Sequence, residues 1–460
     1  MAGLFDSLTM AARSLQSQQY GMNVTGQNIS NVNTPGYTRR VVDFEAVPPG
    51  EGGGVDVQGV RAIRDTLLDR RLLQQVPLGA RDAAIADTLG VVEASLSGIG
   101  AGVDAQLDRF FSAFATLAEN PTSAVARQEV EVSSGTLAST FNDTAARLES
   151  GRRDADGRIR SAVDEINAIT ARIAAINGAL PTAKANGSEL TLEDEQAQLV
   201  RRLSELAGVH VIPRQDGGMD VTIGNGRPLV VGGTGYQIGV TPAGPYGYAS
   251  LTSEGVTITG ELSGGALGGF LEVRDRTIPA YQEALDTIAA QVVTSVNALH
   301  TAGWDLSGAA GGPFFSYRVA PTGVDGTTGA ASAIRLDPAI AADNRRIAAA
   351  AIAASGDNGT ARAIAALRSE RVLGGGTATL TDGWGELMYQ LGSDVQGAED
   401  ARDTHAAITR EVEAMRDQVS GVSLDEEALH LMKFQRAYEA NARFFRAVDD
   451  MLITLLNIVR

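Results

Sequence analysis

The sequence predicts a mainly α-helical protein with two β-containing inserts in the middle of the chain. Apolar residues recur at alternating spacings of three and four at both ends, a pattern typical of helices that pack against other helices. Between the ends, a proline-free stretch from Thr122 to Leu180 keeps a helical apolar pattern, and β-type runs alternate with turn dipeptides from Val209 to Ser263. Because such a chain leaves through its first helix and returns through its last, we expect the terminal helices to form an antiparallel coiled coil.

The first segment, Met1 to Tyr37, is predicted to be a helix followed by a turn. Its only charged residues are Asp6 and Arg13, whereas a solvated helix usually carries charge along its outer face. We therefore expect it to contact neighbours on more than one side. The helix should end at Asn33-Thr34-Pro35-Gly36, because the residue before a proline avoids the helical region. Its seam contains seven apolar residues among the nine positions Leu4, Leu8, Ala11, Leu15, Gln18, Met22, Thr25, Ile29 and Val32.

Long helices are predicted from residue 63 onward, after a glycine cluster at residues 50–54. Two helical segments follow, and the second ends at Asn120-Pro121. The next stretch, to Leu180, suits one very long helix or two helices joined near Gly151. At 1.5 Å per residue, such a rod spans on the order of 80 Å, longer than an ordinary globular domain needs. Asp154-Ala155-Asp156-Gly157 lacks the rest of a calcium loop and is interpreted as a polar break in this helix.

The composition changes at Gly208. Turn dipeptides such as Asp216-Gly217 and Asn225-Gly226 separate short β-type runs, which predicts hairpins and a small β domain over residues 209–268. Helical periodicity returns over residues 269–302. Residues 303–383 are rich in Gly, Ala and Thr and are predicted to form a second, mixed insert.

The last segment, residues 424–460, has the clearest periodicity, kept over five heptads. Nine of its eleven seam positions are apolar: Leu424, Glu427, Leu431, Phe434, Tyr438, Asn441, Phe445, Val448, Leu452, Leu455 and Val459. We predict a terminal coiled-coil domain of residues 1–37 and 424–460, and a long-helix bundle of residues 38–208, 269–302 and 384–423. If the ends of the two terminal helices align, Asn441 lies beside Met22, close to the polar seam residues Gln18 and Thr25.

Composition excludes several classes of function. The 38 basic and 55 acidic residues give a net charge of -17, which argues against nucleic acid or an anionic membrane as a partner. There is no cysteine, so disulfides and thiol catalysis are excluded. The four histidines are scattered, and no phosphate-binding loop is present. We therefore expect no enzyme activity, no catalytic residues, no metal and no cofactor. No apolar run is long enough to cross a membrane, and the N-terminus lacks the pattern of a cleaved secretory signal.

Two terminal motifs carry a resemblance to a known family. Residues 27–37, QNISNVNTPGY, are similar to a signature shared by rod, hook and hook-associated proteins of the bacterial flagellum. Residues 420–427, SGVSLDEE, and residues 434–441, FQRAYEAN, together with long helices after the first motif, resemble the hook-associated protein 1 (FlgK) family. Further similarity lies at residues 268–275 and 300–306.

The resemblance implies a structural subunit of the junction between hook and filament. It implies export, without N-terminal cleavage, through the flagellar secretion apparatus, and a final extracellular location after transit through the cytoplasm. Expected partners are copies of itself in a ring, the hook protein, the second hook-associated junction protein and a cytoplasmic chaperone at the C-terminal helix. The predicted assembly interface contains Leu4, Leu8, Leu15, Met22, Ile29, Val32, Leu431, Phe434, Tyr438, Asn441, Phe445, Val448, Leu452, Leu455 and Val459.

Three alternatives stay open. Both seams can belong to a coiled coil within one monomer, without any role in assembly. The chain can be another axial flagellar protein, either the hook subunit or the second junction protein. A binding or enzymatic module carried on a stalk is the third alternative, with residues 209–263 or 303–383 as its active part.

Overall fold

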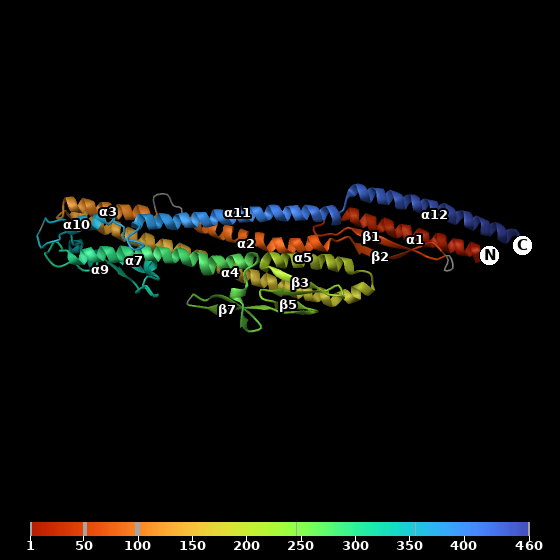
Figure 1. The fold of residues 1–460 in the computed structure, drawn as a ribbon, viewed down its shortest axis with the longest axis horizontal. Coiled ribbons are helices and arrows are strands. Elements are labelled where there is room, and N and C mark those ends of the chain that lie inside the picture. The colour runs from red at the N-terminus through yellow and green to blue at the C-terminus, as the bar shows by residue number, and fades with distance from the viewer. Residues whose placement is uncertain (1, 49–52, 97–101, 245, 355, 459–460) are drawn as a thin grey trace.

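The computed structural model describes residues 2–48, 53–96, 102–244, 246–354 and 356–458. The molecule is a long rod with both termini at one end (Figure 1). There, α1 (Ala2–Ser30) and α12 (Leu424–Ile458) lie side by side and run in opposite directions. Long helices continue the rod, and small sheets come from the middle of the chain. The predicted fold class, mainly α with an antiparallel terminal pair and β inserts, is confirmed.

The rod is built from long helices that run beside one another. The longest, α4 (Ala124–Ala185), has 62 residues and is continuous, so the first of the two predicted alternatives is correct. It does not break at Gly151, where a Cβ atom would lie 2.7 Å from Cγ2 of Val92. The glycine instead lets two helices approach closely. The other rod helices are α2 (Thr66–Leu96), α3 (Val103–Glu119), α5 (Glu189–Ala207), α6 (Gly265–Glu272), α7 (Ile278–Ala302) and α11 (Leu380–Ser420).

A β-hairpin that the sequence analysis did not predict follows the first helix. Its antiparallel strands are β1 (Arg40–Ala46) and β2 (Val55–Ala62). The hairpin packs along α1, where the Ser17 hydroxyl donates to the Val55 carbonyl oxygen at 2.8 Å. It also reaches α12, because the ring centroids of Phe44 and Phe434 are 6.0 Å apart. We call α1, α12 and this hairpin the terminal unit.

The β domain consists of two small antiparallel sheets on one side of α4. Its apolar residues, including Val221, Leu229 and Leu251, share a core with Ile159 and Ile166 of that helix. The Asn177 side chain on α4 donates to the carbonyl oxygens of Met219 and Gly232. One sheet contains β3 (Val209–Pro213), β4 (Met219–Ile223), β5 (Arg227–Val231) and β6 (Thr234–Gly235), and the other contains β7 (Ile238–Ala243), β8 (Tyr248–Ser253) and β9 (Val256–Thr257).

The interpretation of residues 154–157 as a polar break is wrong. The helix continues through them, and Asp156 is buried. Its carboxylate accepts the Ala249 amide at 2.7 Å and pairs with the buried guanidinium of Arg274 at 2.6 Å. Arg274 lies in a five-residue π-helical segment, Val273–Thr277, that joins α6 to α7. The acidic residue therefore ties the β domain to the rod.

The second insert packs at the end of the rod opposite the termini (Figure 1). Aromatic rings join it to α3, since Phe110 lies 6.0 and 5.7 Å from the centroids of Phe314 and Phe315. The buried Arg127 of α4 donates to the Pro121 carbonyl oxygen and, at 2.7 Å, to that of Ile347. The elements here are short: β10 (Phe315–Tyr317), α8 (Ala330–Ala333), β11 (Ile334–Leu336), α9 (Pro338–Ala342) and α10 (Gly359–Ala366).

The fully buried His300 makes the stability of this insert dependent on pH. Its Nε2 atom accepts the Ala348 amide at 2.8 Å, so its Nδ1 atom carries the proton and donates to the Gly312 carbonyl oxygen at 2.7 Å. Burial holds the pKa of His300 below its usual value of 6.5. Below about pH 6.5, His300 binds a proton in the unfolded chain but stays neutral in the folded chain until the pH falls to its lower folded-state pKa. Stability should therefore fall on acidification, by at most about 1.4 kcal/mol per pH unit.

Hydrogen exchange in residues 300–315 at pH 7.5 and 5.5 measures this effect. We expect His300→Gln to remove the pH dependence of local stability, at some cost in stability at neutral pH. His210→Gln serves as the control, because His210 is exposed on β3. An unchanged pH dependence in His300→Gln would contradict the assignment.

Candidate assembly interface

The terminal helices pair in a constant antiparallel register. Gly21 faces Phe434, since a Cβ atom on the glycine would lie 2.9 Å from two ring carbons. Asn28 donates to the Glu427 carboxylate at 3.0 Å. Seven residues separate the two positions on each helix, so the pairing repeats by the heptad.

The register differs from the one obtained by aligning helix ends. One heptad further, it places Asn441 opposite Ser14, about two turns from Met22. The prediction that Asn441 lies beside Met22 is therefore wrong. The helices are aligned at the rod end, where the Arg39 amide donates to the Ser420 carbonyl oxygen. Nothing requires their free ends to coincide, and α12 runs past the start of α1 (Figure 1).

On α1, small and polar residues form the buried face. Ser17, Gly21, Val24, Thr25 and Asn28 are buried, because α12 and the hairpin both approach closely there. Successive helix residues are rotated by about 100°, so the large apolar residues of the predicted seam lie to one side of this face. Ala11 and Thr25 of that seam are buried. Its large apolar members are only half-buried: Leu4, Leu8, Leu15, Met22, Ile29 and Val32.

On α12, the predicted seam does face α1, with Glu427 and Val448 its most buried members, each at 2% exposure. Leu431, Phe434, Asn441, Phe445 and Leu452 are half-buried, Tyr438 and Leu455 are exposed, and Val459 lies outside the described residues.

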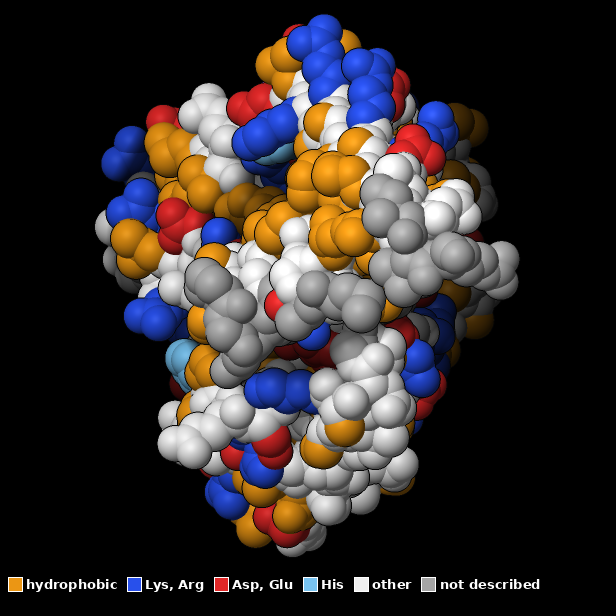
Figure 2. All heavy atoms as spheres, turned by 90° about the vertical axis from the view of Figure 1, so that its right-hand side faces the viewer, with side chains coloured by type: hydrophobic (Ala, Val, Ile, Leu, Met, Phe, Trp, Pro, Cys, Tyr) orange, Lys and Arg blue, Asp and Glu red, His pale blue; other side chains and the backbone are white. Residues whose placement is uncertain are grey.

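A second apolar stripe on α12 escaped the sequence analysis. Leu429, Phe444 and Met451 are 63%, 41% and 51% exposed, and they lie to one side of the first seam. The spacing of seven from Phe444 to Met451 is the signal that could have revealed it. Figure 2 looks onto this end of the molecule and shows hydrophobic side chains gathered between basic and uncharged ones.

The two terminal sequence motifs meet where the terminal unit joins the rod. The Asn28 side-chain oxygen accepts hydrogen bonds from the Tyr37 hydroxyl at 2.8 Å and from the Arg40 backbone amide at 3.0 Å. The Asn28 side-chain amide donates a hydrogen bond to the buried carboxylate of Glu427. Glu427 also pairs with Arg39 at 2.8 Å. Burial raises the pKa of Tyr37, which keeps its hydroxyl protonated as a donor. Asn28 and Tyr37 of the first motif and Glu427 of the second therefore belong to one network, whose centre is buried.

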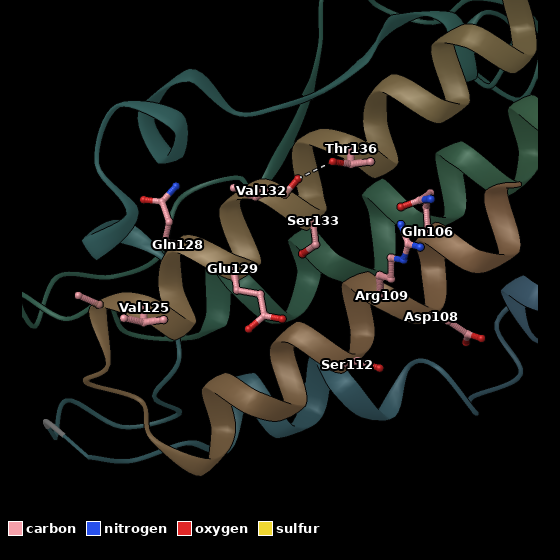
Figure 3. A pocket seen from close by; sticks show the side chains of 11 residues that line it. Gln106, Asp108, Arg109, Ser112, Val125, Gln128, Glu129, Val132, Ser133 and Thr136 are labelled. Carbon is pink, nitrogen blue, oxygen red and sulfur yellow. Dashed lines mark hydrogen bonds between the residues drawn. The ribbon is translucent and has the colours of Figure 1, made fainter. Parts of the chain in front are cut away.

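An open groove of about 810 Å³ lies between α3 and α4. Figure 3 shows its polar side chains spread along both helices, with Gln128 and Asp108 toward opposite ends, rather than converging on one point. Within the described residues, no group of three or more His, Asp or Glu side chains could hold a metal ion. No described helix is long and apolar enough to cross a membrane.

The register predicts opposite effects for two glycines of α1. Gly21→Ala should destabilise the terminal unit by about 1 kcal/mol, because the added methyl group forces the Phe434 ring to move. Gly26→Ala is the matched control, since a Cβ atom there meets nothing within 4 Å, and the higher helix propensity of alanine should stabilise α1 by up to about 1 kcal/mol. Hydrogen exchange along α1 measures both. Shifts of the same sign would contradict the register.

Three family models match this chain. The flagellar hook-associated protein FlgK helical domain matches residues 89–315, the flagellar basal body rod FlgEFG protein C-terminal model matches residues 417–458, and the flagella basal body rod protein model matches residues 8–38. The two shorter matches fall on the terminal unit and its junction with the rod.

Whole proteins are also similar over nearly their full length. Flagellar hook-associated protein 1 of Bacillus subtilis is 26% identical and is aligned over 99% of both chains. Its counterpart in Escherichia coli is 24% identical, aligned over 97% of this chain and 98% of its own. The solved structure of the flagellar hook junction protein FlgK from Burkholderia pseudomallei is 18% identical, with a TM-score of 0.70 over 76% of this chain and all of that one. It shows the same fold.

Proposed function

Because the chain belongs to the FlgK family of flagellar hook-associated proteins, we propose that it is the structural subunit that joins the flagellar hook to the filament. The observation that carries this proposal is the terminal unit, whose two helices leave apolar stripes only partly covered at one end of a long rod. A protein that works alone gains nothing from such surfaces, whereas a subunit that packs among copies of itself buries them.

In the proposed assembly, the terminal units pack side by side in a ring. The half-buried stripe of α1, with Leu8, Leu15 and Met22, and the exposed stripe of α12, with Phe444 and Met451, supply the contacts. Complete burial of each large apolar side chain contributes roughly 1.5–3 kcal/mol, so a few contacts per copy suffice. The predicted interface residues of α12 that face α1 act within the subunit, by holding its two helices together.

We divide the chain by role into four units. The terminal unit, here with the hairpin of residues 40–62, makes the assembly contacts. The helix bundle spaces it from the β domain of residues 209–268 and from the mixed insert of residues 303–383. We assign this protein no catalysis, and its role is structural, at the flagellum outside the cell.

Partners and export follow from the same proposal. The subunit would contact the hook protein on one side and the second hook-associated protein on the other. Before assembly, the exposed apolar residues of α12 need protection from water and from one another, which supports a cytoplasmic chaperone bound to this helix until the flagellar export apparatus takes the chain. The charge of -17 keeps the rest of the free chain soluble.

Deletion of the gene tests the proposal. Cells should then carry hooks without filaments, and expression of the chain in trans should restore the filaments. Antibody labelling of isolated hooks should mark the distal tip alone. Labelling along the whole hook would identify the hook subunit instead, and normal filaments in the deletion strain would refute the proposal.

A further inference from the structure

Two chain connections join the terminal unit to the rod, residues 63–65 and 421–423. Residues 31–39, which link α1 to β1 within the terminal unit, meet both at one crossing, where the Arg39 backbone is hydrogen-bonded to Ile63 and Ser420. Across the described residues, neither α1, α12 nor the hairpin packs extensively against any rod helix. Apolar packing therefore does not set the direction of the terminal unit, and polar contacts at the crossing must do so.

Asp194 of α5 lies at the centre of these contacts. It belongs to the rod and is buried, with 7% exposure. One carboxylate oxygen pairs with Arg40 of β1 at 3.1 Å, and the other pairs at 2.7 Å with Arg64 of the connection that enters α2. A single rod carboxylate is thus held by one arginine from the terminal unit and one from the connection between the two bodies.

Arg40 and Arg64 each have further partners. The Arg40 guanidinium lies over the Tyr37 ring, 5.1 Å from its centroid, and the Arg40 backbone is hydrogen-bonded to the Asn28 side chain. Arg64 has a second partner, Glu193, at 3.4 Å. Asp194 therefore connects the rod directly to the buried network of the two terminal motifs, although it lies in neither of them.

We infer that Asp194 is a positioning residue that sets the direction of the terminal unit relative to the rod. Its negative charge holds two guanidinium groups that would otherwise repel each other. Without it, few links across the crossing remain among the described residues. The Arg40 side chain donates to the Thr191 hydroxyl at 3.3 Å, the Gln198 side chain donates to the Pro35 carbonyl oxygen at 2.6 Å, and the Arg39 amide donates to the Ser420 carbonyl oxygen. Both bodies have their own packing and should stay folded, while the angle between them becomes variable. The inference concerns the free chain and does not depend on the proposed function.

The absence of cysteine makes a direct distance measurement possible. Spin labels at Ala175→Cys on α4 and Gln435→Cys on α12, both exposed positions, report the distance between the two bodies by double electron–electron resonance. We expect one narrow distance distribution in the labelled parent chain. Asp194→Ala should broaden and shift this distribution, while the circular dichroism melting of the rod stays close to that of the parent.

The neighbouring Glu195 provides a matched control. It is a carboxylate on the same helix, but its partner Arg172, at 2.6 Å, belongs to α4 within the rod. Glu195→Ala should leave the distance distribution unchanged. Equal broadening in both variants, or an unchanged distribution in Asp194→Ala, would overturn the inference.

A second variant covers the possibility that Asp194→Ala does not fold. Arg40→Gln removes the ion pair between Asp194 and the terminal unit, and it leaves Asp194 paired with Arg64. It should also broaden the distribution. An unchanged distribution in a folded Arg40→Gln chain would overturn the inference by itself.

Discussion

Replacement of Asp156 by alanine is expected to destabilise the attachment of the β domain to the rod by about 3 kcal/mol. The carboxylate is buried between α4, β8 and the π-helical segment, where it pairs with Arg274 and accepts the Ala249 amide. Without it, a guanidinium with 3% side-chain exposure keeps only Asp275 as a charged partner, and a buried amide loses its acceptor. Hydrogen exchange across residues 248–253 should become roughly 100-fold faster.

The pH dependence of this effect follows from the same contacts. Burial opposes the charge on Asp156, but hydrogen bonds from Ala249, Arg160 and Arg274 outweigh it and hold the pKa of Asp156 below its usual value of 3.8. The stabilisation is therefore fully present above about pH 4 and is lost as the pH falls through the pKa in the folded chain. Arg160→Ala is the control, because its side chain is 42% exposed and the loss of such a pair costs less than about 1 kcal/mol. Equal effects of the two substitutions would contradict a buried ionic link.

The long helices could be predicted because their periodicity persists over many turns. A pattern kept from residue 122 to residue 180 is incompatible with strands, and the structure extends it as α4 to Ala185. Both terminal helices could be predicted in the same way. The β domain was recognisable from its turn dipeptides, since Asn225-Gly226 connects β4 to β5.

The contact face of α1 could not be found by the same method. Hydrophobic periodicity identifies the largest apolar stripe, but the face that meets α12 and the hairpin needs small residues. Gly21 leaves room for Phe434, and Ser17 leaves room for β2. The hairpin itself was missed because its strands flank the glycine cluster. Their β-branched residues, among them Val41, Val42 and Val57, were a usable signal.

The buried ion pairs could not be predicted from the spacing of residues in the sequence. Asp156 meets Arg274 after 118 residues, and Asp194 meets Arg40 across 154 residues. Each carboxylate lies on a helix where an acidic residue is usually solvated. Only the fold brings the arginines to them. The motifs at residues 27–37 and 420–427 were visible as a resemblance, but their joint network became apparent only when Asn28 and Glu427 were seen to touch.

Replacement of Phe444 by aspartate is expected to abolish assembly while the free subunit stays folded. The ring is 41% exposed on the second stripe of α12, so a charge there costs the monomer little. Between copies, the same charge would be buried without a partner, at a cost of several kcal/mol per contact. The variant should be exported, recovered from the medium and missing from hook tips, and filament counts should fall to those of a deletion strain.

Two further variants, Phe445→Asp and Ile408→Asp, test whether the effect of Phe444→Asp is specific to this surface. Phe445 is half-buried on the seam that faces α1, so Phe445→Asp should loosen the terminal unit of the monomer itself, with faster hydrogen exchange along α1, whereas Phe444→Asp should not. Ile408→Asp is the matched control, because Ile408 is 38% exposed on α11, outside the terminal unit, and its replacement should leave filaments in place. Normal filaments on cells that carry only Phe444→Asp would show that the second stripe is not an interface. Loss of filaments with Ile408→Asp would show that any new charge on an exposed helix is harmful. The effect of Phe444→Asp would then give no evidence that the terminal unit carries the assembly surface.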